Sequence, residues 1–258
     1  MSIYIITHKP FNSFTNLQEY KTLLVGADKN SGLPEYLCDN DFQGNISSKN
    51  ANFCELTGAY WILNQCSDEI VGLVHYRRFF KNNCNQAIGM HEIEQYLLEQ
   101  DIILPKREKS TFLGLPCGSK RHFINIHGSE GKDAWEVMEK ILKEKYPEMT
   151  EAFRKYEKQT SGYFYNMCIM KKSDFDRYYE WLFDILFQVE KEINVNSDEI
   201  RIVSSKPENN CVIIGLDDWE SIKETLYLES TGALAKVRER DKHPNGFIDV
   251  DDIDWDEL

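Results

Sequence analysis

The most constraining feature of the chain is a short apolar run that ends in a cluster of cations. Residues 70–74 read Ile-Val-Gly-Leu-Val and are followed directly by His75, Tyr76, Arg77 and Arg78. An unbroken apolar run of this length predicts a strand that is buried on both faces. In open α/β sheets, ligands bind at the carboxyl ends of the strands. The sequence therefore predicts a site for an anionic ligand, such as a nucleotide diphosphate, at the end of this strand.

Strand and helix patterns alternate along most of the chain. Strand patterns cover 3–7, 20–25, 101–104 and 163–170, and helical patterns cover a segment from about 51, then 90–99, 132–145 and 173–193. The alternation predicts an α/β fold with a mostly parallel sheet and flanking helices. The last helix repeats aromatic residues at helical spacing, which predicts a core-facing stripe. Residues 106–131 are polar and lack periodicity, which predicts a loop over a site.

Composition narrows the class of protein. The 258 residues carry a net charge of −13, which argues against nucleic acid as the partner. Seven cysteines show no metal-ligand spacing, so we expect reduced thiols in the cytoplasm. No signal peptide and no apolar run long enough for a membrane span is recognisable in the sequence. We therefore expect a cytoplasmic protein that works on any lipid-linked material from the inner face of the membrane.

The pattern changes after about residue 194. Segments 200–204 and 211–215 predict a hairpin, short helical patterns follow up to 240, and residues 241–258 contain seven acidic residues. Such an acidic segment is expected to remain a tail until it meets a partner. Apolar residues interleaved with the acids predict that this partner is basic and grooved; they are Phe247, Ile248, Val250, Ile253 and Trp255. The predicted domains are 1–193, 194–240 and 241–258.

The first of these domains resembles a known bacterial family. The similarity is carried by CELTGAYW at 54–61, GLVHYRRFF at 72–80, DIILP at 101–105 and YNMCIMKKSDFD at 165–176. It resembles a domain of unknown function found in capsule, exopolysaccharide and O-antigen clusters and associated with glycosyltransferases, including galactofuranosyltransferase-like members. The resemblance implies a type A-like glycosyltransferase fold, a UDP-sugar donor and a growing glycan as acceptor.

The remainder resembles a different family. Residues from about 196, with IRIVSSKPENNCVII at 200–214 and LDDWESIKETLYL at 216–228, are similar to the second half of a Phd/YefM-type antitoxin. That resemblance implies that the tail binds a small basic ribonuclease toxin of the YoeB/RelE type. The DNA-contacting first half of such a module is missing, so DNA binding is not expected. The chain then reads as a fusion, and two alternatives stay open: an interaction protein with an inactive transferase body, or a tail without a role.

Candidate donor-binding residues lie after the first predicted strand and in the segment from 45 to 78. Side chains that could hold phosphate or sugar are Thr7, Lys9, Asn45, Lys49, Asn50, Arg77 and Arg78. Asn50, or Ser47, could instead cap the helix that follows. Either arginine could also be an ion-pair partner of Glu55 or Asp41.

Candidate catalytic residues are Asp41, Glu55 and His75, any of which could take a proton from the acceptor hydroxyl. Asp39 and Asp41 form an Asp-x-Asp that could hold Mg²⁺ or Mn²⁺, although Asp-Asn-Asp is also ordinary loop chemistry. His75 could equally be a structural residue. His127 and Asn166 are the candidates for the acceptor side, and Asn166 could instead bond to backbone.

Overall fold

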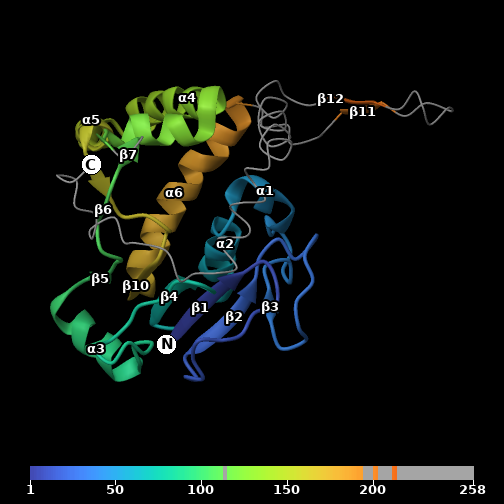
Figure 1. Ribbon diagram of the computed structural model, residues 1–258, viewed down its shortest axis with the longest axis vertical. Helices are drawn as coiled ribbons and strands as arrows, with labels where there is room; N and C mark the ends of the chain where they lie inside the picture. The colour runs from blue at the N-terminus through green and yellow to red at the C-terminus, as the bar shows by residue number, and fades with distance from the viewer. Residues whose placement is uncertain (113–114, 194–199, 203–210, 214–258) are drawn as a thin grey trace, which may run out of the picture. The chain divides into compact units, whose positions relative to one another are not determined.

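The computed structural model describes residues 1–112, 115–193, 200–202 and 211–213 (Figure 1). The chain divides after Val195 into two units, which are described separately. The first unit contains a six-stranded sheet, the helices that the structure describes and every predicted site residue except those of the acidic tail. In the second unit, β11 (Ile200–Ile202) pairs antiparallel with β12 (Cys211–Ile213), so the predicted strand pairing is confirmed.

A six-stranded mixed sheet organises the first unit, in the order β3-β2-β1-β4-β10-β5. Its strands are β1 (Ser2–Thr7), β2 (Tyr20–Leu24), β3 (Leu37–Cys38), β4 (Ile70–His75), β5 (Ile102–Ile103) and β10 (Cys168–Lys171). Strands β1 to β4 are parallel, and β10 runs antiparallel to both β4 and β5. The chain leaves β1 toward β2 on one side and later returns to β4 on the other. Strands β1 and β4 therefore flank the point where the strand order reverses, which is the usual ligand crevice of open α/β sheets.

Helices cover both faces of this sheet. The described helices of this unit are α1 (Asn50–Phe53), α2 (Leu56–Gln65), α3 (Met90–Glu99), α4 (Ser119–Lys145), α5 (Thr150–Lys158) and α6 (Lys172–Ile193), with 3-10 turns at Ser47–Lys49 and Pro147–Met149. Those on the sheet are α2 and α6 on one face and α3 on the other. Because side chains alternate along a strand, Tyr4 and Ile6 pack with α2 and α6, whereas Ile3 and Ile5 pack with α3. Both faces of β1 and β4 are buried, as the apolar runs predicted. The fold class expected from the sequence is confirmed.

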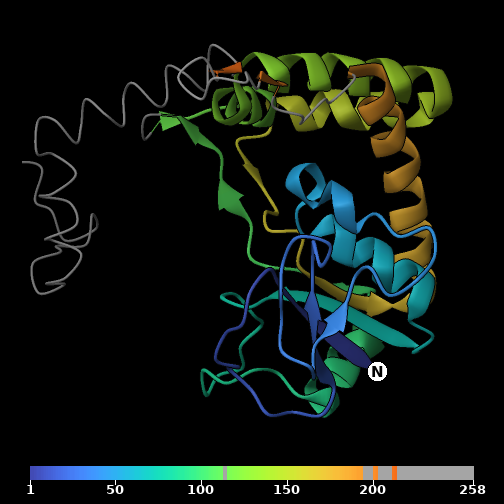
Figure 2. The same ribbon diagram turned by 90° about the vertical axis from the view of Figure 1, so that its right-hand side faces the viewer.

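Helices α4, α5 and α6 form a second layer beyond the sheet (Figures 1 and 2). Ile141 and Leu142 of α4 pack against Ile185 and Val189 of α6 in a separate core cluster. The aromatic stripe on α6 is mostly core, since Phe175, Tyr179 and Phe183 are buried in the cluster beneath α2. The rest of α6 thus links the sheet to the α4–α5 layer. No helix in the described part of the chain is long and apolar enough to span a membrane.

Several sequence-based boundaries were wrong. The predicted loop at 106–131 instead contains β6 (Glu108–Lys109), β7 (Thr111–Phe112), β8 (Leu115–Pro116) and the first part of α4. Non-helical dihedral angles at Gly128 divide α4 into two helices, and the predicted helix 132–145 lies within the second. The predicted strand 163–170 is too long: only its end belongs to β10, and residues 163–167 form a turn that follows β9 (Ser161–Gly162). Ser47 caps no helix, since its hydroxyl donates to the Asp39 carboxylate.

Candidate functional site

The site lies where β1 and β4 end side by side. Register places Ile6 opposite His75, and the Tyr76 amide donates to the Ile6 carbonyl at 3.1 Å. Beyond β1, the Lys9 ammonium lies 5.7 Å from the centre of the Tyr76 ring, and the His8 ring meets the same ring edge-on. The segments after the two strands therefore form one surface around Tyr76.

A tight turn after β4 presents the two arginines. The His75 amide donates to the Arg78 carbonyl at 2.9 Å, and the Arg78 amide donates to the His75 carbonyl at 3.1 Å. The Arg77 guanidinium lies over the Tyr76 ring at 4.8 Å, and the Arg78 guanidinium lies over the Tyr165 ring at 4.2 Å. Stacking on an aromatic face holds a guanidinium in place while its N–H groups remain available to an anion.

These cations have no acidic partner within the described residues. Lys9, Arg77 and Arg78 are exposed and take part in none of the ion pairs there. The alternative in which an arginine pairs with Glu55 or Asp41 is therefore wrong for this structure, since those carboxylates bond elsewhere. Three exposed cations without an acidic partner among the described residues, on a chain with a net charge of −13, make this surface a candidate anion site.

The turn between β9 and β10 completes the site. Tyr165 and Asn166 have φ angles of 75° and 50°, values that cost free energy in residues other than glycine. His75 Nε2 lies 2.5 Å from the Tyr165 carbonyl; because a carbonyl only accepts, this nitrogen carries the hydrogen. The Tyr165 hydroxyl donates to Glu108 at 2.9 Å, and this bond raises the pKa of Tyr165, so the hydroxyl stays protonated. His75 therefore holds the turn through Nε2 and cannot use that atom as a base.

Glu55 enters the site through a break between two helices. Cys54 separates α1 from α2 with a φ angle of 47°, and Glu55 follows it directly. Because α2 leads back to the start of β4, its own first residues lie at the edge where β4 ends. There the Asn166 amide donates to Glu55 Oε1 at 2.7 Å. The structure thus brings together Glu55, His75, Arg78 and Asn166, which lie far apart in the sequence.

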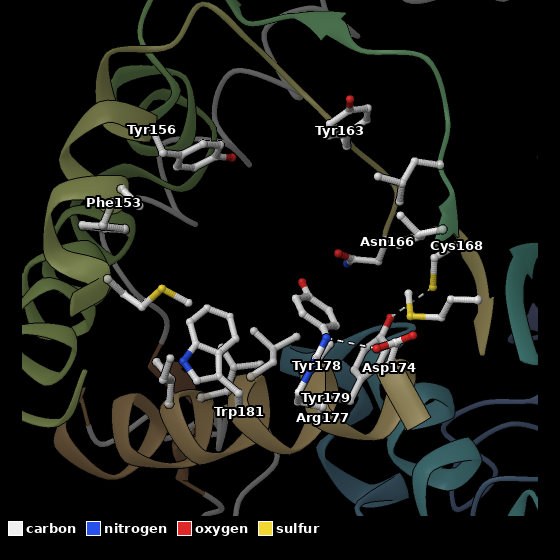
Figure 3. A pocket seen from close by; sticks show the side chains of 18 of the residues that line it. Phe153, Tyr156, Tyr163, Asn166, Cys168, Asp174, Arg177, Tyr178, Tyr179 and Trp181 are labelled. Carbon is white, nitrogen blue, oxygen red and sulfur yellow. Dashed lines mark hydrogen bonds and ion pairs between the residues drawn. The ribbon is translucent and has the colours of Figure 1, made fainter. Parts of the chain in front are cut away.

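A cavity of about 1000 Å³ opens beside this cluster (Figure 3). Asn166 lies on its wall and Figure 3 shows its amide directed into the opening, with Tyr163 on the same side and Tyr156 and Phe153 opposite. Tyr178 and Trp181 of α6 form the floor in this view. Large aromatic surfaces with a few polar groups are typical of pockets for organic ligands. Tyr178, predicted to be core with the rest of its stripe, is 44% exposed and lines this cavity.

The contacts of Asp39 do not fit a metal ligand. Its carboxylate is buried and accepts from the amides of Gly26 and Ala27, at 2.8 and 3.0 Å, and from the hydroxyls of Ser47 and Thr57, each at 2.6 Å. These donors occupy the lone pairs that a cation would need. Asp41 accepts instead from the Trp61 indole N–H at 2.5 Å. Nowhere in the described chain do three His, Cys, Asp or Glu side chains gather as metal ligands.

Four predicted donor-binding residues have structural contacts instead. Lys49 forms an ion pair with Glu190 at 2.5 Å, which ties the 3-10 turn to α6. Asn45 donates to the Phe42 carbonyl at 2.7 Å, and Asn50 donates to the Cys54 carbonyl at 2.7 Å. The buried Thr7 hydroxyl donates to the Lys9 carbonyl at 2.6 Å, so Thr7 shapes the loop that carries Lys9. Each of these side chains thus has a structural role, and donor binding by them stays a prediction.

The remaining predicted site residues lie apart from this cluster or outside the described part of the chain. His127 lies exposed on α4, and the centre of its ring lies 4.5 Å from the centre of the Phe123 ring. This contact is within α4 and does not involve the residues after β4. The predicted toxin-binding residues lie outside the described residues, and the toxin partner stays a prediction; they are Phe247, Ile248, Val250, Ile253 and Trp255.

Sequence reasoning missed three contributors to the site. Tyr76 and Tyr165 provide the rings over which the cations lie, and Glu108 fixes Tyr165. Tyr76 stands within the charged cluster that drew attention to β4, so its position was a usable signal. Glu108 reaches the site because β6 pairs with β9, a contact across more than fifty residues that no local pattern indicates.

Comparison with known proteins places this geometry in a family. The model of the domain of unknown function DUF4422 matches residues 2–203. The chain belongs to this family. The DUF4422 match runs past the boundary predicted at 193 and includes β11, which the sequence had assigned to the antitoxin-like part.

A solved structure shares the fold. A structure described as the WbbM bifunctional glycosyltransferase in its apo form matches with a TM-score of 0.60 and 28% identity over 76% of this chain. The match spans 38% of that protein, so it concerns one part of a larger molecule. No curated protein matched the chain. The DUF4422 domain described here is therefore similar in structure to a portion of a glycosyltransferase.

Proposed function

We propose that the DUF4422 domain is a glycosyltransferase that moves a sugar from a nucleotide sugar to a glycan. The observation that carries the proposal is the set of three cations at the strand-order reversal, Lys9, Arg77 and Arg78, which have no acidic partner in the described part of the chain and lie beside the Glu55–Asn166 pair. The similarity to a bifunctional glycosyltransferase supports it. The site thus combines cations that suit a diphosphate with a carboxylate that could act as a base.

The cations suit the leaving group of this reaction. When the bond between the anomeric carbon and the diphosphate breaks, negative charge develops on the departing nucleoside diphosphate. Preorganised cations at that position stabilise the transition state more than the ground state. Arg77 and Arg78, held over aromatic rings, can donate paired N–H bonds to phosphate oxygens, while Lys9 adds a point charge.

Glu55 is the carboxylate placed to take the acceptor proton. In an inverting transfer, the acceptor hydroxyl attacks the anomeric carbon while a base removes its proton. One Glu55 oxygen accepts from Asn166, which orients the group and leaves lone pairs on the carboxylate for the hydroxyl. Asp41, the other carboxylate candidate, is tied to Trp61 beyond β3. We therefore assign the base to Glu55 and a positioning role to Asn166.

The aromatic cavity is the proposed acceptor side. Asn166 belongs both to the Glu55 pair and to the cavity wall, so a molecule in the cavity would reach the base at that residue. Tyr156, Tyr163 and Tyr178 offer ring faces with polar tips, which suit the mixed surface of a sugar ring. The family resemblance leads us to propose a UDP-sugar donor, with galactofuranose as one candidate, and a capsular, exopolysaccharide or O-antigen glycan as acceptor.

The donor assignment is tested by calorimetric titration with UDP and a panel of UDP-sugars, with and without Mn²⁺. The double variant R77A/R78A should bind UDP at least about 100-fold more weakly, because each lost bond to a charged group contributes roughly 1.5–3 kcal/mol. The matched control K29A/K171A removes two exposed lysines that take part in no described ion pair and should bind as the wild type does. Absence of binding by the wild type, or equal binding by both variants, would contradict the site.

A further inference from the structure

A second cationic surface lies apart from the candidate site, around the β7–β8 hairpin. Residues 106–121 contain five basic residues and one acidic residue, Glu108, in a chain that is otherwise strongly acidic. The cations on this segment without a described acidic partner are Lys106, Arg107, Lys109 and Arg121, and all four are exposed. Figure 2 shows the green strands of this region beside α4 and away from the blue strands of the sheet.

Large apolar side chains accompany these cations. Leu115 on β8 is 71% exposed, Ile126 on α4 is 62% exposed, and Phe112 on β7 is 37% exposed. Phe112 and Leu115 are register partners in the hairpin, so they lie together at its end. We call these seven residues the hairpin surface: Lys106, Arg107, Lys109, Phe112, Leu115, Arg121 and Ile126.

The apolar and basic groups of the hairpin surface are interleaved. The Arg121 guanidinium lies 5.5 Å from the centre of the Phe112 ring. His122 Nδ1 lies 2.9 Å from the Thr111 carbonyl, which attaches the start of α4 to β7, and Ile126 is one helical turn further along the same face. Arginine beside an exposed apolar ring can reach a charged layer while the ring enters an apolar one.

We propose that the hairpin surface docks on an anionic lipid bilayer. Entry of the exposed leucine, isoleucine and phenylalanine into the boundary between headgroups and acyl chains is favourable, and the exposed cations are attracted to acidic headgroups. A nucleic acid would engage the cations but would leave Leu115 and Ile126 in water. The segment therefore matches a membrane surface better than a nucleic-acid backbone.

Docking through the hairpin surface would place the aromatic cavity next to the bilayer. The Arg107 guanidinium lies 5.6 Å from the centre of the Tyr163 ring, and Tyr163 lines the aromatic cavity. The hairpin surface therefore adjoins the cavity wall opposite α6. The inference does not depend on the proposed transferase activity, because lipid binding is measured directly and without donor or acceptor.

The test is cosedimentation of the full chain with vesicles of phosphatidylcholine alone or mixed with phosphatidylglycerol. The wild type should bind the mixed vesicles, and added salt should weaken binding because screening shortens the reach of surface charges. The variant K106E/K109E/R121E should bind about 100-fold more weakly, since each cation near an anionic surface contributes about fivefold or more. The affinity of the variant F112S/L115S for the mixed vesicles should be about tenfold lower, and its binding should still weaken with added salt.

A matched control makes the charge effect specific. K29E/K171E/K191E changes the net charge equally at three exposed lysines outside the hairpin surface and should keep most of the binding. Circular dichroism melting confirms that each variant is folded before it is compared. The proposal is overturned if folded wild-type chain ignores the mixed vesicles, if the two triple variants bind alike, or if duplex DNA or RNA binds where vesicles do not.

Discussion

At the scale of single residues, charged side chains near the carboxyl edge of the sheet have opposite fates. Asp39 is buried and fully used by four donors, whereas Arg77 and Arg78 are exposed and lie over rings without a described acidic partner. A sequence pattern weighs these residues equally, because it shows type and spacing and not which lone pairs or N–H groups are already satisfied. Contacts thus separate a carboxylate that holds loops from cations that can meet a ligand.

Asp39→Ala should therefore destabilise the domain strongly. It leaves two backbone amides and two hydroxyls without their acceptor, and we expect the free energy of unfolding to fall by about 3 kcal/mol or more. Asp41→Asn keeps an acceptor oxygen for Trp61 at an exposed position and should cost less than about 1 kcal/mol. Urea unfolding with and without Mn²⁺ measures both. A metal role for Asp39 would appear as Mn²⁺-dependent stability of the wild type that the alanine variant loses.

At the scale of elements, the regular parts of the site could be predicted and its turns could not. Strand β4 and helix α3 were predicted nearly residue for residue, because their periodic patterns follow directly from burial. The turn at 163–166 was read as strand, since Tyr-Phe-Tyr-Asn-Met has the composition of one. Only tertiary bonds to His75 and Glu55 hold Tyr165 and Asn166 at positive φ. Strain of this kind, maintained by distant partners, leaves no local signal.

The turn offers a test that separates backbone shape from amide chemistry. Asn166→Gly permits the φ angle of 50° but removes the amide that orients Glu55, whereas Asn166→Ala removes the amide and adds backbone strain of about 1 kcal/mol. Both should lower the rate of the proposed transfer by at least about tenfold. Only the alanine variant should also melt earlier. Near-normal rates in the glycine variant would show that Asn166 does not position the base.

At the scale of the whole molecule, charge and family membership divide the chain at nearly the same place. The DUF4422 match ends at residue 203, and residues 204–258 carry 14 acidic and 6 basic residues, so most of the net charge of −13 lies beyond the match. All three described core clusters are built from residues up to 193. The anion sites proposed here, after β4 and on the hairpin surface, lie within the less acidic part. The acidity that argues against nucleic acid as a partner is thus concentrated outside the domain that would bind these anions.

A chain ending at residue 203 should therefore keep the fold and the proposed donor site. Its melting temperature should lie within about 4 °C of that of the full chain, because the described core clusters lose no residue and a shift of this size corresponds to about 1 kcal/mol. UDP affinity, measured by the same titration, should be equal or higher, since acidic residues that repel the nucleotide have been removed. Restoring the net charge with added acidic residues after residue 203 controls for that effect. Aggregation, or a much lower melting temperature, would show instead that residues beyond 203 belong to the folding unit of the DUF4422 domain.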